Sequence, residues 1–310
     1  MGLQPQRIDN LIDYLDRMES ILDESDFTPD EREKLIETLR LEVVEVLKVA
    51  FNEGDRTIRR SAIYGLSKIG LNQSNDFFLS ALSDSDEHVR GWAAEALGVL
   101  RDSRTIPALI KALADENHYV CFNVAAALKQ FAPDQLLHHL VGALKDNDRY
   151  IRRRVGKLLG EIGDLTVTDA LISALHDEDA GVRYEAAEAL RKLKSSAAIL
   201  PLISALTDSN HDVRAVAIMA LGNFGDERAI EPLTAMLVEQ KDHRHACLES
   251  LSQICGEENM ENFYELIRNS HKCINETSRT VLEHIYAKRA GKSTENPASC
   301  YQSVGNHYNY

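Results

Sequence analysis

The residues capable of chemistry are few and scattered along this chain of 310 residues. Its cysteines form no Cys-x-x-Cys pair and their odd number indicates reduced thiols rather than a disulfide framework. They are Cys121, Cys247, Cys255, Cys273 and Cys300. The densest metal-capable group is His243, His245 and Cys247, but a helix places only 243 and 247 on one face. We interpret it as partly exposed histidines beside a buried cysteine and leave the metal alternative open.

Catalytic motifs do not stand out either. No base accompanies Cys121 nearby in the sequence, so we expect a small buried hydrophobic residue there rather than a nucleophile. A Gly-rich phosphate loop, a Ser/His/Asp order and a paired-carboxylate motif are all missing from the sequence. The sequence therefore assigns no catalytic residue, and whether the protein is an enzyme stays open.

Charge and composition exclude several classes of protein. The 35 basic and 49 acidic residues give a net charge of −14, which argues against a nucleic-acid binder. With 44% hydrophobic and 27% charged residues, the composition is that of a globular protein. The apolar runs are far shorter than the roughly 20 residues that span a bilayer, and the first residues do not resemble a secretory signal. We expect a cytoplasmic protein without a membrane span.

The dominant feature of the sequence is a repeat of 31 residues. One column pairs a branched apolar residue with arginine, except that cysteine replaces the arginine once: Ile58-Arg59, Val89-Arg90, Val120-Cys121, Ile151-Arg152, Val182-Arg183 and Val213-Arg214. A second column holds Leu66, Leu97, Leu128, Leu159, Leu190 and Leu221. Two columns in the same phase predict a repeated structural unit.

Each repeat predicts a pair of helices. A helix N-cap precedes every branched residue, at Asp55, Asp86, Asn117, Asp148, Asp179 and Asn210. Apolar residues then follow with helical spacing, and the glycines Gly70, Gly163, Gly225 and Gly256 fall where that helix must end. A second helix closes the unit at an aspartate, in the column Asp84, Asp115, Asp146, Asp177 and Asp208. This aspartate fits either a turn or a pair with the arginine column of a neighbouring repeat.

Two helices in 31 residues cannot bury their apolar faces alone, so the repeats must stack. We predict an all-α fold, a right-handed α-solenoid of about seven helical hairpins over residues 55–271. Residues 1–54 are expected to form capping helices, the second opened by Thr28, Pro29 and Glu31 as a capping box. We predict a C-terminal capping helix over residues 272–290 and a flexible tail over 291–310.

The segment DEHVRGWAAEALGVLRDSRTIPALIKALAD resembles the HEAT-like repeat named after phycobilisome lyases, and the resemblance covers roughly residues 55–256. The resemblance implies a protein-binding adaptor or scaffold, or a bilin lyase subunit. Lyase subunits of the E type carry a Tyr-Tyr-Ala-Ala-Trp-Trp run, whereas this chain has one tryptophan. A di-iron deoxyhypusine hydroxylase needs His-Glu ligand pairs, which the sequence lacks. A HEAT-like DNA glycosylase needs a positive groove, which the net charge disfavours.

Positions that vary between repeats indicate the surface available to a partner. They lie at offsets 2, 3, 6 and 10 from the branched residue, on one face of the first helix. The resemblance implies that this face lines the concave side. The candidate binding residues are Tyr64, Trp92, Phe122, Asn123, Arg153, Arg154, Lys157 and Tyr184. We expect Gly91 to leave space around the Trp92 indole. Alternatively, the aromatic residues pack on neighbouring helices, and glutamates 161, 185 and 188 neutralise the basic cluster.

These observations predict an adaptor, scaffold or assembly factor that recognises a protein partner in the concave groove, with no cofactor and no nucleic acid. The alternative is a subunit of a phycobilin lyase, or a factor acting on phycobiliproteins, that holds a tetrapyrrole at the same aromatic and basic residues.

Overall fold

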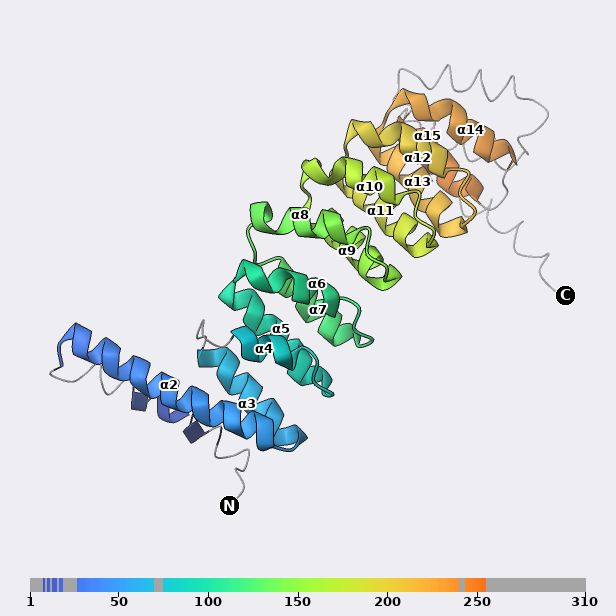
Figure 1. Ribbon diagram of the computed structural model, residues 1–310. Helices are drawn as coiled ribbons and strands as arrows, with labels where there is room; N and C mark the ends of the chain where they lie inside the picture. Colours follow the sequence, from blue (N-terminus) through green and yellow to red (C-terminus); the bar gives the residue numbers. More distant parts are fainter. Residues whose placement is uncertain are drawn as a thin grey trace, which may run out of the picture. The chain divides into compact units, whose positions relative to one another are not determined.

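The computed structural model describes residues 27–69, 75–239 and 243–254, together with residues 8, 10, 11, 13–15, 17 and 18. Every regular element in these residues is helical (Figure 1). The chain divides into two compact units, Met1–Leu158 and Leu159–Tyr310, which are described separately. The predicted C-terminal helix at 272–290 and the tail at 291–310 lie outside the described residues.

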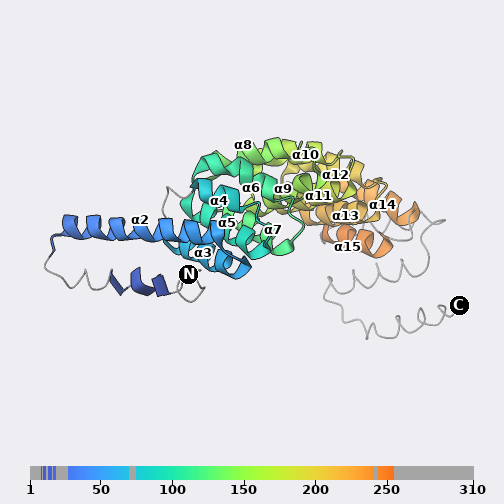
Figure 2. The same cartoon turned by 60° about the horizontal axis from the view of Figure 1, so that its bottom comes forward.

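The first unit consists of a long helix followed by helical hairpins. The helices are α2 (Pro29–Glu53), α3 (Arg56–Ile69), α4 (Asn75–Ala81), α5 (Glu87–Leu100), α6 (Ile106–Ala112), α7 (His118–Leu128) and α8 (Pro133–Ala143), with α9 (Arg149–Ile162) at the boundary. The first helices of successive hairpins pack on one another, α3 on α5 and α5 on α7, while α4 and α6 cover them (Figure 2). The predicted hairpins are therefore present.

The second unit repeats this arrangement. After the end of α9 come α10 (Thr168–Ala174), α11 (Ala180–Leu193), α12 (Ile199–Ala205), α13 (His211–Phe224), α14 (Ile230–Glu239) and α15 (Arg244–Ile254). Here α11 packs on α13 and α13 on α15, while α10, α12 and α14 form the other layer of contacts. None of the described helices combines the length and apolar character needed to cross a bilayer.

Side chains at the helix starts confirm the predicted N-cap column. The Asp86 carboxylate accepts hydrogen bonds from the backbone N–H groups of His88 and Val89, at 3.0 and 3.2 Å. The other five members of the column also accept from backbone N–H groups at the start of their helices. The Thr28 and Glu31 side chains form the predicted capping box at α2. Each cap satisfies N–H groups that a helix leaves without partners.

The helix ends follow the predicted glycine column only in part. Gly163 and Gly225 adopt left-handed backbone conformations, with φ of 78° and 67°. In two repeats a residue with a side chain takes this conformation, Arg101 with φ of 53° and Lys194 with φ of 54°. The two remaining predicted glycines, 70 and 256, lie outside the described residues. The left-handed turn is thus kept without glycine at two helix ends, whereas α7 ends at Lys129 with φ of −68°.

The repeated leucines form the core, and Leu66, Leu97, Leu128, Leu159, Leu190 and Leu221 are all buried. Adjacent first helices approach closely where one of them carries a glycine. A Cβ on Gly98 would lie 2.6 Å from Cα of Ala127, and one on Gly160 would lie 2.7 Å from Cα of Ala189. Because such contacts are too short for real atoms, these glycines determine how closely the hairpins stack.

The closing aspartates hold the turn and also pair with an arginine, but with the arginine of their own repeat and not, as the second alternative had it, with that of a neighbouring repeat. Asp115 accepts from the backbone N–H of Asn117 at 2.8 Å, which holds the turn. Its two oxygens also accept from Nε and Nη2 of Arg90, at 2.6 and 2.9 Å. Burial opposes ionisation of this carboxyl, but these hydrogen bonds hold the pKa of Asp115 below its ordinary value. Arg59 with Asp84 and Arg183 with Asp208 repeat the pair.

The arginine also holds the turn before its own helix. Nη1 of Arg90 donates to the Asp84 carbonyl at 2.8 Å, so one guanidinium joins the turns of two repeats. Equivalent bonds to the preceding turn come from Arg152, Arg183 and Arg214. We call this repeated set of bonds the arginine ladder. The planar guanidinium donates in several directions at once, which explains why arginine rather than lysine fills the column.

Candidate functional site

Four rings from three helices form a continuous row in the first unit. Tyr64 on α3 lies with its ring centroid 5.7 Å from that of Trp92 on α5. The His88 ring, also on α5, lies 5.9 Å from Trp92 and 5.5 Å from Tyr119 on α7. These are ordinary distances for favourable ring pairs. We call Tyr64, Trp92, His88 and Tyr119 the aromatic row.

The row exists because the first helices present corresponding positions on one side. Tyr64 is at offset 6 from its branched residue, Trp92 at offset 3, and His88 and Tyr119 one residue before theirs. Offsets −1, 3 and 6 lie within two turns on one helical face. The packing of α3 on α5 and of α5 on α7 then brings the rings into contact.

Gly91 makes room for Tyr119, not for the Trp92 indole as the sequence suggested. A Cβ at position 91 would lie 2.4 Å from Cε1 of Tyr119. Asn123 supports the same tyrosine, since its Nδ2 donates to the Tyr119 carbonyl at 3.0 Å. Asn123 is half-buried, so the structure gives this candidate binding residue a packing role.

The side of the row that faces solvent carries large apolar side chains. Phe122 on α7 is 72% exposed, and Tyr150 on α9 is 49% exposed. Trp92 is half-buried between its neighbours, whereas Tyr64 keeps 43% of its surface exposed. Isolated exposed side chains need no explanation, but several large rings on adjacent helices are typical of a binding surface.

The predicted basic cluster divides into exposed and structural residues. Arg153 and Lys157 are exposed on α9. Arg154 is half-buried and donates to the backbone carbonyls of Leu113 and Asp115, at 3.0 Å for the second. Arg154 therefore holds the turn between α6 and α7 rather than facing a partner with all of its donors.

Tyr184 belongs to the other compact unit. It is half-buried on α11, where Glu188 accepts two hydrogen bonds of 2.7 Å from Arg191 on the same helix. The Arg191 side chain lowers the pKa of Glu188, so this carboxylate has a partner within its own helix. The structure thus brings the rings of Tyr64 and Trp92 into contact, places Phe122 and Asn123 on the neighbouring helix α7, and describes Tyr184 with the second unit alone.

A charged cluster lies at the start of α5 beside the aromatic row. Asp86 is 2% exposed and accepts from Nε of Arg56 and from Nε and Nη2 of Arg60, the latter two at 2.8 Å. Nη2 of Arg60 also lies 2.9 Å from Nδ1 of His88. Burial opposes ionisation of Asp86, but both guanidinium groups hold its pKa far below the ordinary value.

Two groups of residues could be considered as metal ligands, and neither suits that role. Asp86, Glu87 and His88 lie within ligand distance of one another, but two arginines already occupy the Asp86 oxygens. At the second group, Cys247 and His243 are buried and His245 is exposed. The predicted orientation is confirmed, although His243 is more buried than we expected. Burial raises the pKa of the Cys247 thiol to about 12, which disfavours the thiolate that binds metals.

Cys121 is a buried thiol, as the sequence suggested. Its Sγ donates to the Asp115 carbonyl at 3.1 Å. Burial raises its pKa, although the Arg154 charge opposes this shift. A thiol held protonated in this way is a poor nucleophile.

Sequence reasoning missed His88, Tyr119 and Tyr150 as members of this face. All three stand one residue before the branched residue of their repeat, one helical turn ahead of the chosen offsets 2 and 3. That column varies among Thr, His, Tyr, Tyr, Gly and Asp, so its variation was a signal available in the sequence.

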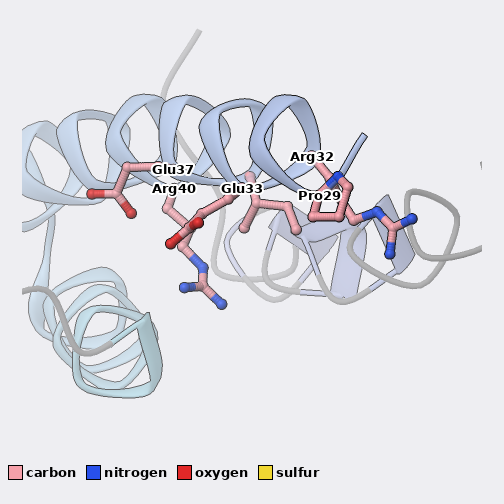
Figure 3. A pocket seen from close by; sticks show the side chains of 6 residues that line it. Pro29, Arg32, Glu33, Glu37 and Arg40 are labelled. Atoms are coloured by element: carbon pink, nitrogen blue, oxygen red, sulfur yellow. The ribbon is translucent and has the colours of Figure 1, made fainter. Parts of the chain in front are cut away.

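A shallow depression lies on α2, away from the aromatic row (Figure 3). It is lined by Pro29, Arg32, Glu33, Ile36, Glu37 and Arg40. These residues recur at intervals of three and four, so they form one stripe of the helix. The stripe mixes acidic and basic side chains, a pattern typical of a solvated helix surface.

Stacked helical hairpins joined by a repeated ladder define the class of this protein as an all-α solenoid. A family model for HEAT repeats matches residues 43–129, 75–155, 137–203 and 199–274, which together span most of the chain. The protein belongs to the HEAT-repeat family. No curated protein matches the chain.

Solved structures resemble the chain only at the level of the fold. Human deoxyhypusine hydroxylase in complex with glycerol is 21% identical, with a TM-score of 0.35. The match covers 81% of this chain and 99% of the hydroxylase chain. Escherichia coli YibA is 20% identical, with a TM-score of 0.42 and coverages of 79% and 95%. An engineered protein is 18% identical, with a TM-score of 0.42 and coverages of 89% and 84%.

Proposed function

We propose that this protein is a protein-binding adaptor or assembly factor that recognises its partner with the face formed by α3, α5, α7 and α9. The observation that carries the proposal is the aromatic row together with the exposed Phe122 beside it. Tryptophan, tyrosine and arginine dominate the binding energy of protein interfaces. This face gathers all three residue types in a chain with only 6% aromatic residues.

The variation among repeats supports the same face. Core positions keep Leu, Ala or Val from one repeat to the next, because stacking requires them. Offset 3 of the proposed face instead changes from Ser61 to Trp92 to Asn123. Such variation suits the recognition of an irregular partner, and repeat proteins commonly bind partners along the surface that stacking creates.

The proposal is tested by purifying the tagged full chain from its native host and identifying the retained proteins by mass spectrometry. An absorbance scan of the same material detects a bound tetrapyrrole, which would favour the lyase alternative. Phe122→Ala should weaken binding of the purified partner by about 2 kcal/mol, or about thirtyfold in Kd. Because Phe122 is 72% exposed, its loss should leave the unfolding midpoint nearly unchanged.

Leu200→Ala is the matched control, since Leu200 is an apolar side chain 61% exposed on α12 in the other unit. Equal partner recovery by the wild type and Phe122→Ala would contradict the proposal. Trp92→Ala is a second variant, but this tryptophan is half-buried against Tyr64 and His88. Its binding loss counts only after its folded state has been verified by circular dichroism and urea unfolding.

A further inference from the structure

We propose that the partner presents a linear acidic segment with an apolar centre, which lies across α3, α5, α7 and α9. This inference rests on the proposed function and adds the chemistry of the partner. It is argued from the charges that flank the aromatic row, from the exposure of the central rings and from the arrangement of the helices.

The charge of this face is opposite to that of the chain. Of the basic residues at offsets −1, 2, 3, 6 and 10 of the four helices, Arg60 already pairs with Asp86 and Glu87. The other basic residues, Lys68, Arg153, Arg154 and Lys157, still outnumber the acidic residues at these offsets, Glu95 and Glu161. The whole chain carries a net charge of −14. A local excess of basic residues attracts an acidic partner and disfavours a basic one.

The basic residues lie at both ends of the face, and the apolar residues lie between them. At one end Nζ of Lys68 is 5.2 Å from the centre of the Tyr64 ring. At the other end Lys157 is exposed on α9, and the Arg154 guanidinium lies 6.0 Å from the centre of the Tyr150 ring. The middle of the face holds Trp92 on α5 and Phe122 on α7. A complementary segment therefore has acidic ends and an apolar centre.

The packing of the rings favours a linear segment over a side chain that enters a pocket. Neighbouring rings of the aromatic row are 5.5 to 5.9 Å apart, so they leave no hollow between them. The depression described above is lined by residues of α2 and contains no residue of the aromatic row. An occupant must lie on the rings and follow them from helix to helix.

The length of the segment follows from the helix spacing. The packed helices α3, α5 and α7 lie about 10 Å apart, so the distance from α3 to α7 is about 20 Å. An extended chain advances about 3.3 Å per residue, so about six residues reach from α3 to α7, and a segment that continues to α9 is longer. Acidic segments with few apolar residues do not fold alone, so binding would order this segment.

The inference is tested by phage display of random peptides of about twelve residues on the immobilised full chain. Two fluorescent peptides are then compared by anisotropy. The acidic probe has glutamates at both ends and leucine, proline and phenylalanine in its centre, and the basic probe replaces the glutamates with lysine. We expect selected peptides to be enriched in Asp and Glu, and only the acidic probe to bind, more weakly as salt is raised.

Variants of the chain test where the probe lies. The pair Lys68→Glu and Lys157→Glu should weaken acidic-probe binding at least about tenfold at low salt, and Phe122→Ala should do the same at any salt. The control pair is Lys34→Glu and Lys145→Glu, two exposed lysines outside the face. The control should change the dissociation constant less than about twofold.

Failure of this inference is distinguishable from failure of the proposed function. Recovery of peptides without acidic enrichment, equal binding of the basic probe, or equal effects of the two lysine pairs would overturn the acidic segment. So would selection of no peptide at all. The proposed function itself survives those results if Phe122→Ala still loses the native partner.

Discussion

Asp146 accepts a hydrogen bond of 2.6 Å from Nζ of Lys111, although the repeat assigns this carboxylate to an arginine at position 121. Cys121 occupies that position, and a cysteine has no guanidinium that could donate to Asp146. The other bond of the missing arginine, to the Asp115 carbonyl, comes from Nη1 of Arg154. Two side chains from the hairpins before and after thus replace one residue of the arginine ladder.

Because Lys111 and Arg154 take the place of one arginine of the ladder, we expect the loss of Lys111 and the loss of Asp146 to change the free energy of unfolding unequally. Asp146→Ala should cost about 1–2 kcal/mol, because Asp146 also accepts from the backbone N–H of Asp148 at 3.0 Å. Lys111→Ala should cost less than about 1 kcal/mol, since the Lys111 side chain is 68% exposed and its charge is screened. Urea unfolding measures both, and equal losses would contradict the turn-holding role of Asp146.

The close helix contact at Gly98 predicts that alanine is unfavourable there despite its higher helix propensity. Gly98→Ala places a Cβ 2.6 Å from Cα of Ala127, so we expect a loss of about 1–3 kcal/mol. Gly142→Ala on α8 is the control, because its Cβ would meet nothing within 4 Å. That control should gain up to about 1 kcal/mol. Stabilisation by both substitutions would show that the hairpins separate easily.

The left-handed residue at the end of α11 predicts a stabilising substitution. A side chain in this conformation costs about 1–2 kcal/mol, which exceeds the entropy cost of glycine. Lys194→Gly should therefore raise the free energy of unfolding by about 0.5–1 kcal/mol. Gly225→Ala, at the equivalent end of α13, should lower it by a similar amount. Thermal unfolding of both variants checks this, and a destabilised Lys194→Gly would contradict it.

The fold was predictable because its causes are local and repeated. An Asp or Asn three residues before a branched residue predicts a helix start wherever it occurs, and all six such caps are formed. The buried leucine column follows from helical spacing in the same way. That Asp115 holds the turn and also pairs with Arg90 of its own repeat was not predictable, since it depends on how α5 and α6 pack within one hairpin.

The candidate site was predictable only where one helix determines it. Tyr64, Trp92 and Phe122 lie on the varying face, as their phase predicts. The role of Gly91 depends on Tyr119 from the next helix, which no spacing within one repeat reveals. Arg154 likewise bonds to the turn of a preceding hairpin because Cys121 has left that turn without its arginine. Such replacements follow from an irregular repeat and require the packed structure to be seen.

Asp86 predicts a loss of stability in acid. Its folded-state pKa is lowered, so its ion pairs stabilise the protein above the ordinary carboxyl value, about 3.9, and are lost as the pH falls further. Hydrogen bonds from Arg104 and Arg228 likewise lower the pKa of Asp102 and of Asp226 to about 2. The free energy of unfolding should therefore decrease between about pH 4 and pH 2.

Asp86→Asn isolates the contribution of this carboxylate, because asparagine keeps the N-cap but loses the charge that Arg56 and Arg60 contact. At pH 7 the variant should be less stable than the wild type by about 2 kcal/mol, since it leaves two guanidinium groups without their carboxylate. The difference should shrink as the pH falls from about 4 to 2, because the unfolded wild-type chain then binds a proton at Asp86 that the folded state does not. Urea unfolding at a series of pH values measures the difference, with Asp134→Asn, an exposed position on α8, as the control. A difference between Asp86→Asn and the wild type that stayed constant from pH 7 to pH 2 would show that the ion pairs of Asp86 do not stabilise the fold.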